Sequence, residues 1–281
     1  MNYRHAFHAG NAADVFKHMT LCAALARLAE KPTPFCVTET HAGAGMYVLA
    51  AGDAGAEWQR GIGRIWAQRR EWPAFAAYFA LVARLNPVKG GLQAYPGSPL
   101  FVRDALRAAD RAVFIEQQPD EYDVLRANLR RSRRVAVHCA DGWDTGLAVL
   151  PPRENRGLVF VDPPYEAANE FKRVVAFLDA ALARFRNGVF LVWYPIKSPL
   201  AVTRLHAAVR SLTRDARVPA CALELLTLPE DAANRLNGSG FVMLNAPWQL
   251  PETLRDALDP VAAALAGPQG RPAVRLTTLS A

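Results

Sequence analysis

The clearest indication of the fold is the segment Gly157-Leu158-Val159-Phe160-Val161-Asp162-Pro163-Pro164-Tyr165. Its first five residues form an unbroken apolar run, which predicts a strand covered on both faces. Other short apolar runs of this kind occur at 35–39, 112–116, 135–139, 188–193, 220–228 and 240–245. The sequence therefore predicts seven strands.

Helical patterns lie between most of these strands, at 14–30, 119–129 and 170–185. Alternation of strand and helix predicts a doubly wound α/β sheet, mostly parallel. The last two strands depart from this order, because only a loop with the Gly-rich Asn237-Gly238-Ser239-Gly240 separates them. A hairpin is the economical interpretation, so we expect the seventh strand to run antiparallel.

One connection is much longer than a crossover helix requires. Residues 40–111 separate the first two strands, and 57–86 are dense in aromatic residues, Ala and Arg at helical spacing. We therefore predict one domain over 1–281 that carries an inserted helical subdomain at about 47–95. The insertion leaves after the first strand, which places it at the carboxyl edge of the sheet, where ligands bind.

Composition excludes several classes of protein. The chain is 51% hydrophobic and 21% charged, as expected for a globular domain and not for a disordered chain. No apolar run approaches the roughly 18 residues of a membrane span, and the N-terminus has no apolar signal region. The four cysteines form no C-x-x-C pair. We expect a cytoplasmic protein with no membrane contact and no metal.

The charge balance points toward polyanions. The net charge is +7, and only five of the 33 basic residues are lysines. Arginine pairs with phosphate through two hydrogen bonds and stacks on bases, so this surface suits a nucleic acid. The many Ala residues indicate the alternative, that arginine usage reflects genome composition.

The segment Asp162-Pro163-Pro164-Tyr165 suits an exocyclic amine. The amine of a base is a poor nucleophile because its lone pair is conjugated with the ring. The Asp162 carboxylate and the Pro163 carbonyl can each accept one N–H and hold the nitrogen in line with a methyl donor. Tyr165 can stack on a base that has left its helix or loop. The alternative is an Asx turn and a rigid exit from the strand, with Tyr165 packed in the core.

Acidic residues end three consecutive strands. Glu39 precedes the Gly-rich loop Thr40-His41-Ala42-Gly43-Ala44-Gly45, but position 48 is Val, which disfavours a dinucleotide site. Glu116 can accept both hydroxyls of a ribose, and Asp141, followed by Gly142, can accept the amine of an adenine. Each acid alone is more typical of a solvated turn. Together with the loop they indicate a nucleoside site.

These residues resemble a family. The matching pieces, spread from residue 3 to about 248, are Tyr3-Arg4-His5-Ala6-Phe7-His8-Ala9-Gly10-Asn11, Asp14-Val15-Phe16-Lys17-His18, the 40–45 loop, Tyr95-Pro96-Gly97-Ser98-Pro99, Asp141-Gly142, Asp162-Pro163-Pro164-Tyr165, Trp193-Tyr194-Pro195 and Gly238-Ser239-Gly240. The chain is similar to the RlmJ family, the class I S-adenosylmethionine-dependent methyltransferases that act on an adenine N6 of bacterial 23S ribosomal RNA. The tetrapeptide at 162–165 is generic to amino-methyltransferases, whereas the opening segment and Pro-Gly-Ser-Pro are far more specific.

The resemblance implies a Rossmann-like sheet of seven strands, the last antiparallel, with a helical insertion. It implies that Asp162 takes up the amine proton and that Tyr3 touches the RNA. It also implies contacts with S-adenosyl-L-methionine, which becomes S-adenosyl-L-homocysteine, from His18, His41, Ser98, Glu116, Asp141, Gly142 and Asp162. One residue departs from the family pattern: Glu39 stands where Asp is usual.

The N-terminal segment has two interpretations. Tyr3, Arg4 and the neighbouring polar and aromatic residues can offer stacking and phosphate contacts to RNA. Alternatively the segment packs as a lid with satisfied histidines. The basic run Arg126, Arg130, Arg131, Arg133 and Arg134 is typical of a solvated helix end, with phosphate contact as the alternative.

The sequence thus predicts a monomeric enzyme, with no obligatory protein partner, that methylates adenine N6 in 23S ribosomal RNA. The catalytic residues are expected to be Asp162, Pro163 and Tyr165, and the RNA contacts Tyr3, Arg4 and Tyr165. Two alternatives stay open: a DNA adenine methyltransferase, and a non-catalytic nucleic-acid-binding protein on the same scaffold.

Overall fold

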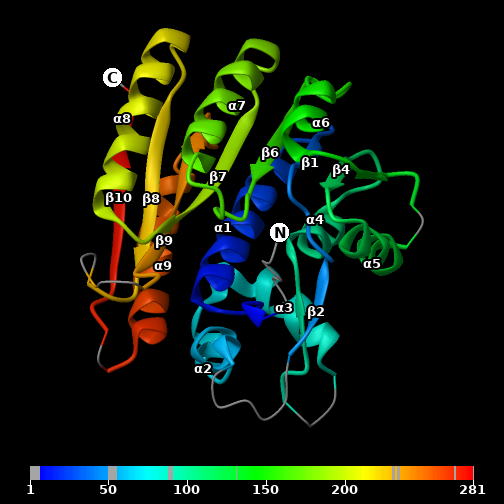
Figure 1. The fold of residues 1–281 in the computed structure, drawn as a ribbon. Helices are drawn as coiled ribbons and strands as arrows, with labels where there is room; N and C mark the ends of the chain where they lie inside the picture. Colours follow the sequence, from blue (N-terminus) through cyan, green and yellow to red (C-terminus); the bar gives the residue numbers. More distant parts are fainter. Residues whose placement is uncertain are drawn as a thin grey trace.

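A twisted eight-stranded sheet with helices on both faces forms the centre of the molecule in the computed structural model (Figure 1). The structure describes residues 7–49, 56–87, 91–130, 132–229, 232, 235–268 and 270–280. The strand order across the sheet is β10-β8-β9-β7-β6-β1-β4-β5. The strands are β1 (Cys36–Glu39), β4 (Arg111–Glu116), β5 (Val135–Cys139), β6 (Gly157–Val161), β7 (Val189–Ile196), β8 (Ala220–Leu226), β9 (Gly238–Leu244) and β10 (Ala273–Thr278).

Five neighbouring strands run parallel, from β7 through β6, β1 and β4 to β5. Strand β9 pairs antiparallel with both β7 and β8, which confirms the predicted hairpin and the predicted direction of the seventh strand. The predicted number of strands is wrong, because β10 adds an eighth strand antiparallel to β8. As a half-exposed edge strand with the sequence Ala-Val-Arg-Leu-Thr-Thr, β10 lacks the continuous apolar run that marks the other strands.

The two faces of the sheet are covered by different helices. Along β6, Leu158 and Phe160 pack with one set, and Val159 and Val161 pack with the other, as the alternation of a strand requires. The first set is α1 (Ala12–Ala29), α4 (Ser98–Ala105), α5 (Pro119–Leu129) and α9 (Leu250–Ala266). The second is α6 (Gly142–Ala148), α7 (Glu170–Arg184) and α8 (Pro199–Ala216).

The helices predicted at 14–30, 119–129 and 170–185 correspond to α1, α5 and α7. Helix α1 begins after Asn11, whose side chain accepts the backbone N–H of Asp14 at 2.9 Å and caps the first turn. None of the helices in the described part of the chain combines the length and the apolar composition that a membrane crossing requires.

The long connection after β1 contains an antiparallel pair and several short helices. Strands β2 (Met46–Val48) and β3 (Ala94–Pro96) pair with each other, and this pair was not predicted. Between them lie η2 (Glu57–Arg60), α2 (Ile62–Ile65), η3 (Arg69–Glu71), η4 (Pro73–Phe75) and α3 (Ala76–Leu85). Ile62, Ile65 and Tyr78 are fully buried in the same core as α1. That residues 47–95 form a separate helical subdomain stays a prediction.

Candidate active site

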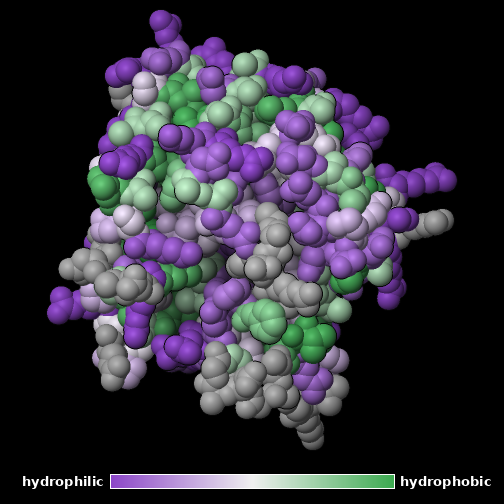
Figure 2. All heavy atoms as spheres, viewed as in Figure 1, coloured by the Kyte–Doolittle hydropathy of each residue, from purple (hydrophilic) through white to green (hydrophobic). Residues whose placement is uncertain are grey.

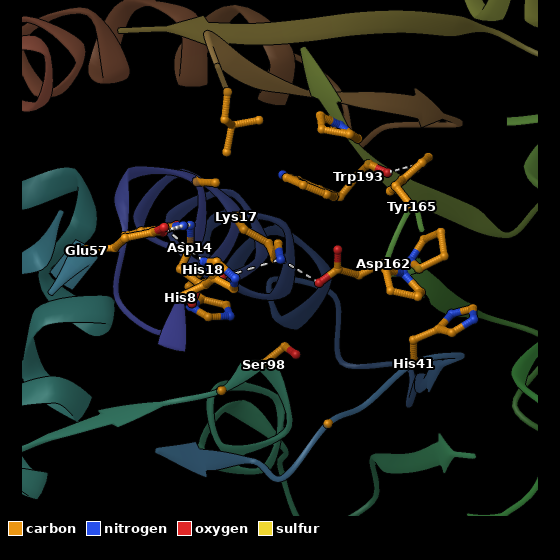
Figure 3. Close-up of a pocket in the computed structure, with 18 of the residues that line it drawn as sticks. His8, Asp14, Lys17, His18, His41, Glu57, Ser98, Asp162, Tyr165 and Trp193 are labelled. Atoms are coloured by element: carbon orange, nitrogen blue, oxygen red, sulfur yellow. Dashed lines mark hydrogen bonds and ion pairs between the residues drawn. The ribbon is translucent and has the colours of Figure 1, made fainter. Parts of the chain in front are cut away.

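A cavity of about 860 Å³ opens at the carboxyl ends of the parallel strands. In the strand register, Glu39 at the end of β1 lies level with Phe114 and Phe160. Glu116 and Asp162 therefore lie two residues further along the strands that flank β1. Predicted site residues that line the cavity are His18, His41, Ser98, Glu116, Asp162, Pro163 and Tyr165. Figure 3 labels His18, His41, Ser98, Asp162 and Tyr165 among them.

Asp162 is held by a lysine from the first helix. The Lys17 Nζ atom lies 2.6 Å from Asp162 Oδ2 and 3.4 Å from Asp14 Oδ1, and Figure 3 shows the lysine pointing across the cavity at Asp162. The Lys17 side chain is only 6% exposed and that of Asp162 16%. Such a desolvated, charge-assisted pair fixes the carboxylate in one orientation.

The same lysine contacts the aromatic wall of the cavity. Its ammonium lies 4.4 Å from the ring centroid of Trp193, within the range of a cation–π contact. Asp14 is itself fixed, because its Oδ2 accepts the backbone N–H of Gly10 at 3.0 Å. Lys17 was not among the predicted site residues, although its segment was part of the family resemblance. Only the spacing Asp14-x-x-Lys17 on one helix could have indicated a paired, inward-facing lysine.

Tyr165 is fixed by its own hydroxyl. It donates to the Trp193 carbonyl at 2.6 Å, and its ring packs against Phe171 and the edge of Trp193. Its backbone has a φ of 53°, in the left-handed region that residues other than Gly rarely adopt. Burial raises the pKa of Tyr165 well above its usual range, so the hydroxyl stays a donor. The hydroxyl bond and the ring contacts thus hold the Tyr165 side chain in the wall of the cavity.

Glu116 is held by the backbone. Its Oε2 accepts the N–H of Gly43 and its Oε1 accepts the N–H of Gln118, both at 2.8 Å. Gly43 has a φ of 60°, and a Cβ there would come within 2.4 Å of the Tyr47 hydroxyl. Glycine is therefore required at this turn, where the chain passes close to the Glu116 carboxylate.

Glu39 lies beneath the cavity and does not line it. It is fully buried, and its Oε1 accepts a short hydrogen bond from the Ser98 hydroxyl. Burial raises the pKa of the Glu39 carboxyl well above its usual range. Its Oε2 has no hydrogen-bond partner among the described residues. Glu39, the residue that departs from the family pattern, therefore contacts a residue of the cavity wall, Ser98, and does not line the cavity itself.

The two predicted histidines are oriented by hydroxyl groups. His18 Nδ1 lies 3.0 Å from the Tyr95 hydroxyl, which also contacts the Tyr78 hydroxyl. His41 Nδ1 lies 2.8 Å from Thr40 Oγ1, and burial lowers the pKa of His41 to about 4. At neutral pH His41 is therefore an uncharged ring at the cavity wall.

Asp141 and Gly142 do not line the cavity. An oxygen of Asp141 caps α6 by accepting the backbone N–H groups of Trp143 at 2.8 Å and Asp144 at 3.0 Å. A Cβ at Gly142 would lie 1.9 Å from the Thr40 carbonyl oxygen, so packing explains this glycine. Their contact with a methyl donor stays a prediction. Tyr3 and Arg4 lie outside the described residues.

The described residues hold no group of three or more His, Cys, Asp or Glu side chains placed to bind a metal. The cavity instead combines two kinds of wall. Around Gly43, Ser98 and Glu116 it offers backbone and carboxylate groups, and around Lys17, Asp162 and Trp193 it offers a buried ion pair and an aromatic ring.

A mostly parallel sheet with a terminal hairpin, and a cavity at the carboxyl ends of its strands, defines the Rossmann-like fold of class I methyltransferases. The family model described as "Ribosomal RNA large subunit methyltransferase D, RlmJ" matches residues 32–278. The chain belongs to this family of methyltransferases.

Two curated relatives share much of the sequence. "Ribosomal RNA large subunit methyltransferase J" of Haemophilus influenzae is 35% identical over 260 residues, which are 92% of each chain. The protein of the same name from Escherichia coli is 36% identical over 261 residues, 92% of this chain and 91% of the relative. A crystal structure of a protein from Legionella pneumophila covers 98% of this chain and 100% of its own, with 30% identity and a TM-score of 0.86.

Proposed function

We propose that this methyltransferase transfers a methyl group from S-adenosyl-L-methionine to the exocyclic N6 of an adenine in 23S ribosomal RNA. The observation that carries the proposal is that one cavity holds both Asp162-Pro163 and the Gly43–Glu116 contact. The first suits an amine and the second a nucleoside. The relatives' names, which specify large-subunit ribosomal RNA, support the choice of substrate.

The residues around Gly43 fit the methyl donor. Each oxygen of Glu116 accepts one backbone N–H and keeps a second lone pair, which can accept a ribose hydroxyl. Gly97 lines the cavity without a side chain that could fill it. A Cβ at this position would lie 3.2 Å from Gly45, so the two backbone segments pass close to each other. His18, His41 and Ser98 complete this side of the cavity. When bound, S-adenosylmethionine supplies a methyl group activated by its sulfonium.

The residues around Asp162 fit the amine. The Asp162 carboxylate, which lines the cavity and is oriented by Lys17, can accept one N–H of the adenine amine. The Pro163 carbonyl accepts the other N–H, and the ring of Tyr165 offers a surface for the base. These contacts aim the nitrogen lone pair at the donor.

The proton balance involves Asp162. As the N–C bond forms and the S–C bond breaks, the amine nitrogen becomes strongly acidic and one of its protons leaves. The Asp162 carboxylate accepts it. Lys17 stabilises the carboxylate form of Asp162, so the proton passes on readily to solvent and the site resets.

Methyl incorporation tests the proposal. We would supply labelled S-adenosylmethionine with protein-free 23S RNA, assembled large subunits or adenine-rich DNA, and analyse the digested nucleosides. We expect N6-methyladenosine from RNA. Label in DNA alone, in another base, or in none of the three acceptors would contradict the proposal.

A binding measurement tests the donor separately. S-adenosylhomocysteine should raise the Tm of the protein, because a ligand that binds the native state alone stabilises it, whereas NAD should not. A shift with NAD and none with S-adenosylhomocysteine would contradict the donor assignment. We expect the protein to act as a monomer, which sedimentation would show.

A further inference from the structure

Three cationic side chains line the mouth of the cavity and come from distant parts of the chain. Arg60 ends η2 in the long connection after β1, Lys197 follows β7, and Arg235 lies in the connection before β9. All three are exposed. We call Arg60, Lys197 and Arg235 the cationic rim.

Several arginines elsewhere in the molecule are bonded within the fold, unlike the cationic rim. Arg107 bonds Asp110 and three backbone carbonyls, Arg111 bonds Glu154, and Arg156 bonds the carbonyls of Leu28 and Thr33. These three arginines are thus used inside the fold. Within the described ranges no rim residue takes part in an ion pair.

The basic run predicted as a solvated helix end, with phosphate contact as the alternative, is mostly exposed: Arg126, Arg130 and Arg133 are all exposed. Arg134 is half-buried and donates to the carbonyls of Leu106 and Arg107, and Arg126 lies over the ring of Tyr122. Arg131 lies outside the described residues. None of these arginines lines the cavity.

Acidic groups near the rim are already bonded. Glu57 accepts from Asn11 at 2.8 Å and lies 3.0 Å from His8, and Asp162 pairs with Lys17. The Glu57 carboxylate raises the pKa of His8, and the nearby Lys197 ammonium acts in the opposite direction. Glu166, exposed beside Tyr165, is a further acidic residue of the lining.

We propose that the cationic rim binds the backbone phosphates on either side of the target nucleotide while its base enters the cavity. A nucleotide that has left its stack leaves its phosphates outside, at the mouth, where exposed cations meet them. Arg60 belongs to the connection after β1, while Lys197 and Arg235 belong to the β7–β9 region. The phosphates on the two sides would thus be held by different parts of the fold. This inference rests on the proposed function for its choice of RNA as the ligand.

The test measures binding directly, without methyl transfer. The triple variant Arg60→Ala/Lys197→Ala/Arg235→Ala is compared with wild type by fluorescence anisotropy on a short RNA hairpin with adenines in its loop. A single-stranded phosphate contact contributes about 0.7 to the slope of log Kd against log salt, so three lost contacts should lower the slope by about 2. At low salt Kd should rise by at least roughly tenfold.

The matched control changes three exposed arginines at the opposite edge of the sheet, Arg186→Ala/Arg210→Ala/Arg214→Ala, with the same change of net charge. We expect it to keep the wild-type slope within about 0.5. S-adenosylhomocysteine should raise the Tm of both variants as it does for wild type. An unchanged slope in the rim variant, an equal loss in the control, or no measurable RNA binding by wild type would overturn the inference.

The same data separate this inference from the proposed function. If the rim variant shows the expected lower slope but the wild-type protein transfers no methyl group, the proposed activity is rejected and the role of the rim is retained. If wild-type protein methylates RNA but the rim variant keeps the wild-type slope, the role of the rim is rejected and the proposed activity is retained.

Discussion

Two acidic strand ends on either side of β1 are held in different ways. Glu116, at the end of β4, is held by the backbone N–H groups of Gly43 and Gln118. Asp162, just after β6, is held by the side chain of Lys17. One side of the cavity is thus fixed by the path of the chain, and the other by a pair of charges.

The difference has consequences for function. A carboxylate held by backbone donors keeps its place as long as the loop does, so a substitution nearby changes it little. A buried ion pair depends on both partners, because removal of either leaves an uncompensated charge. We expect the Asp162 side to be sensitive to single substitutions in catalysis, and the Glu116 side to respond mainly in donor binding.

The largest effect should come from Asp162→Ala, which removes the acceptor for the amine. A positioned acid–base group contributes about 10² to 10⁴ in rate, so single-turnover methyl transfer at saturating donor should drop by that factor. Asp162→Asn keeps an acceptor oxygen and should lose less. Circular dichroism controls for folding, and a folded Asp162→Ala variant near the wild-type rate would refute the role of this residue.

The next effect should come from Lys17→Met, which keeps a long side chain and removes the charge. The Asp162 carboxylate then loses its fixed orientation, and a misplacement of about 1 Å costs roughly 10² in rate. The free energy of unfolding should also fall, by up to about 3 kcal/mol. Lys172→Met, on the exposed face of α7, is the matched control.

A double variant sharpens the same comparison. If Lys17 acts through Asp162, the losses in Lys17→Met/Asp162→Asn should be less than the product of the single losses, since the second change removes a partner already lost. Independent, multiplicative losses would show that Lys17 serves another contact.

A smaller effect is expected at Glu116→Gln. The amide keeps one acceptor oxygen but turns an NH₂ group toward a backbone N–H, which costs about 1–3 kcal/mol. Calorimetry should show S-adenosylhomocysteine binding weakened by roughly tenfold, with the rate at saturating donor much less changed. Asp123→Asn, exposed on α5, should bind as wild type does. A Glu116→Gln variant that loses rate but binds S-adenosylhomocysteine as wild type does would contradict the proposed division of the cavity into a donor side and an amine side.

The smallest effect concerns pH. Burial lowers the pKa of His41 to about 4, whereas an unfolded histidine has a pKa of about 6.5. Between these values the unfolded chain binds the proton first, so the free energy of unfolding falls as the pH is lowered through this window. Urea unfolding of His41→Gln at about pH 7 and about pH 5 should show a weaker pH dependence than wild type. The control is His138→Gln, which changes an exposed histidine and should keep the pH dependence of wild type. A His41→Gln variant with the wild-type pH dependence would contradict the conclusion that His41 is uncharged at neutral pH.

The parallel part of the sheet and the place of its site could be predicted from the sequence. Continuous apolar runs such as 157–161, which are short and alternate with helical patterns, indicate strands covered on both faces. The residue after such a run is then expected at the ligand-binding edge of the sheet. Asp162, Glu116 and the Gly43 turn were predicted for this reason. The edge strand β10 was not, because a half-exposed strand carries no such run and takes its structure from pairing with β8.

The partners of these residues could not be predicted from the sequence, because they depend on the packing of distant segments. Lys17 and Asp162 are 145 positions apart, and no local pattern relates a helix near the N-terminus to the end of β6. In the same way Asp141 carries the same strand-end signal as Glu116, yet its oxygen caps α6 because the helix begins at the next residue. Local sequence sets which groups end at an edge, since strand and turn preferences are short-ranged. The pairing of Lys17 with Asp162 depends on the packing of α1 against the sheet, and this packing cannot be inferred from any short segment of the sequence.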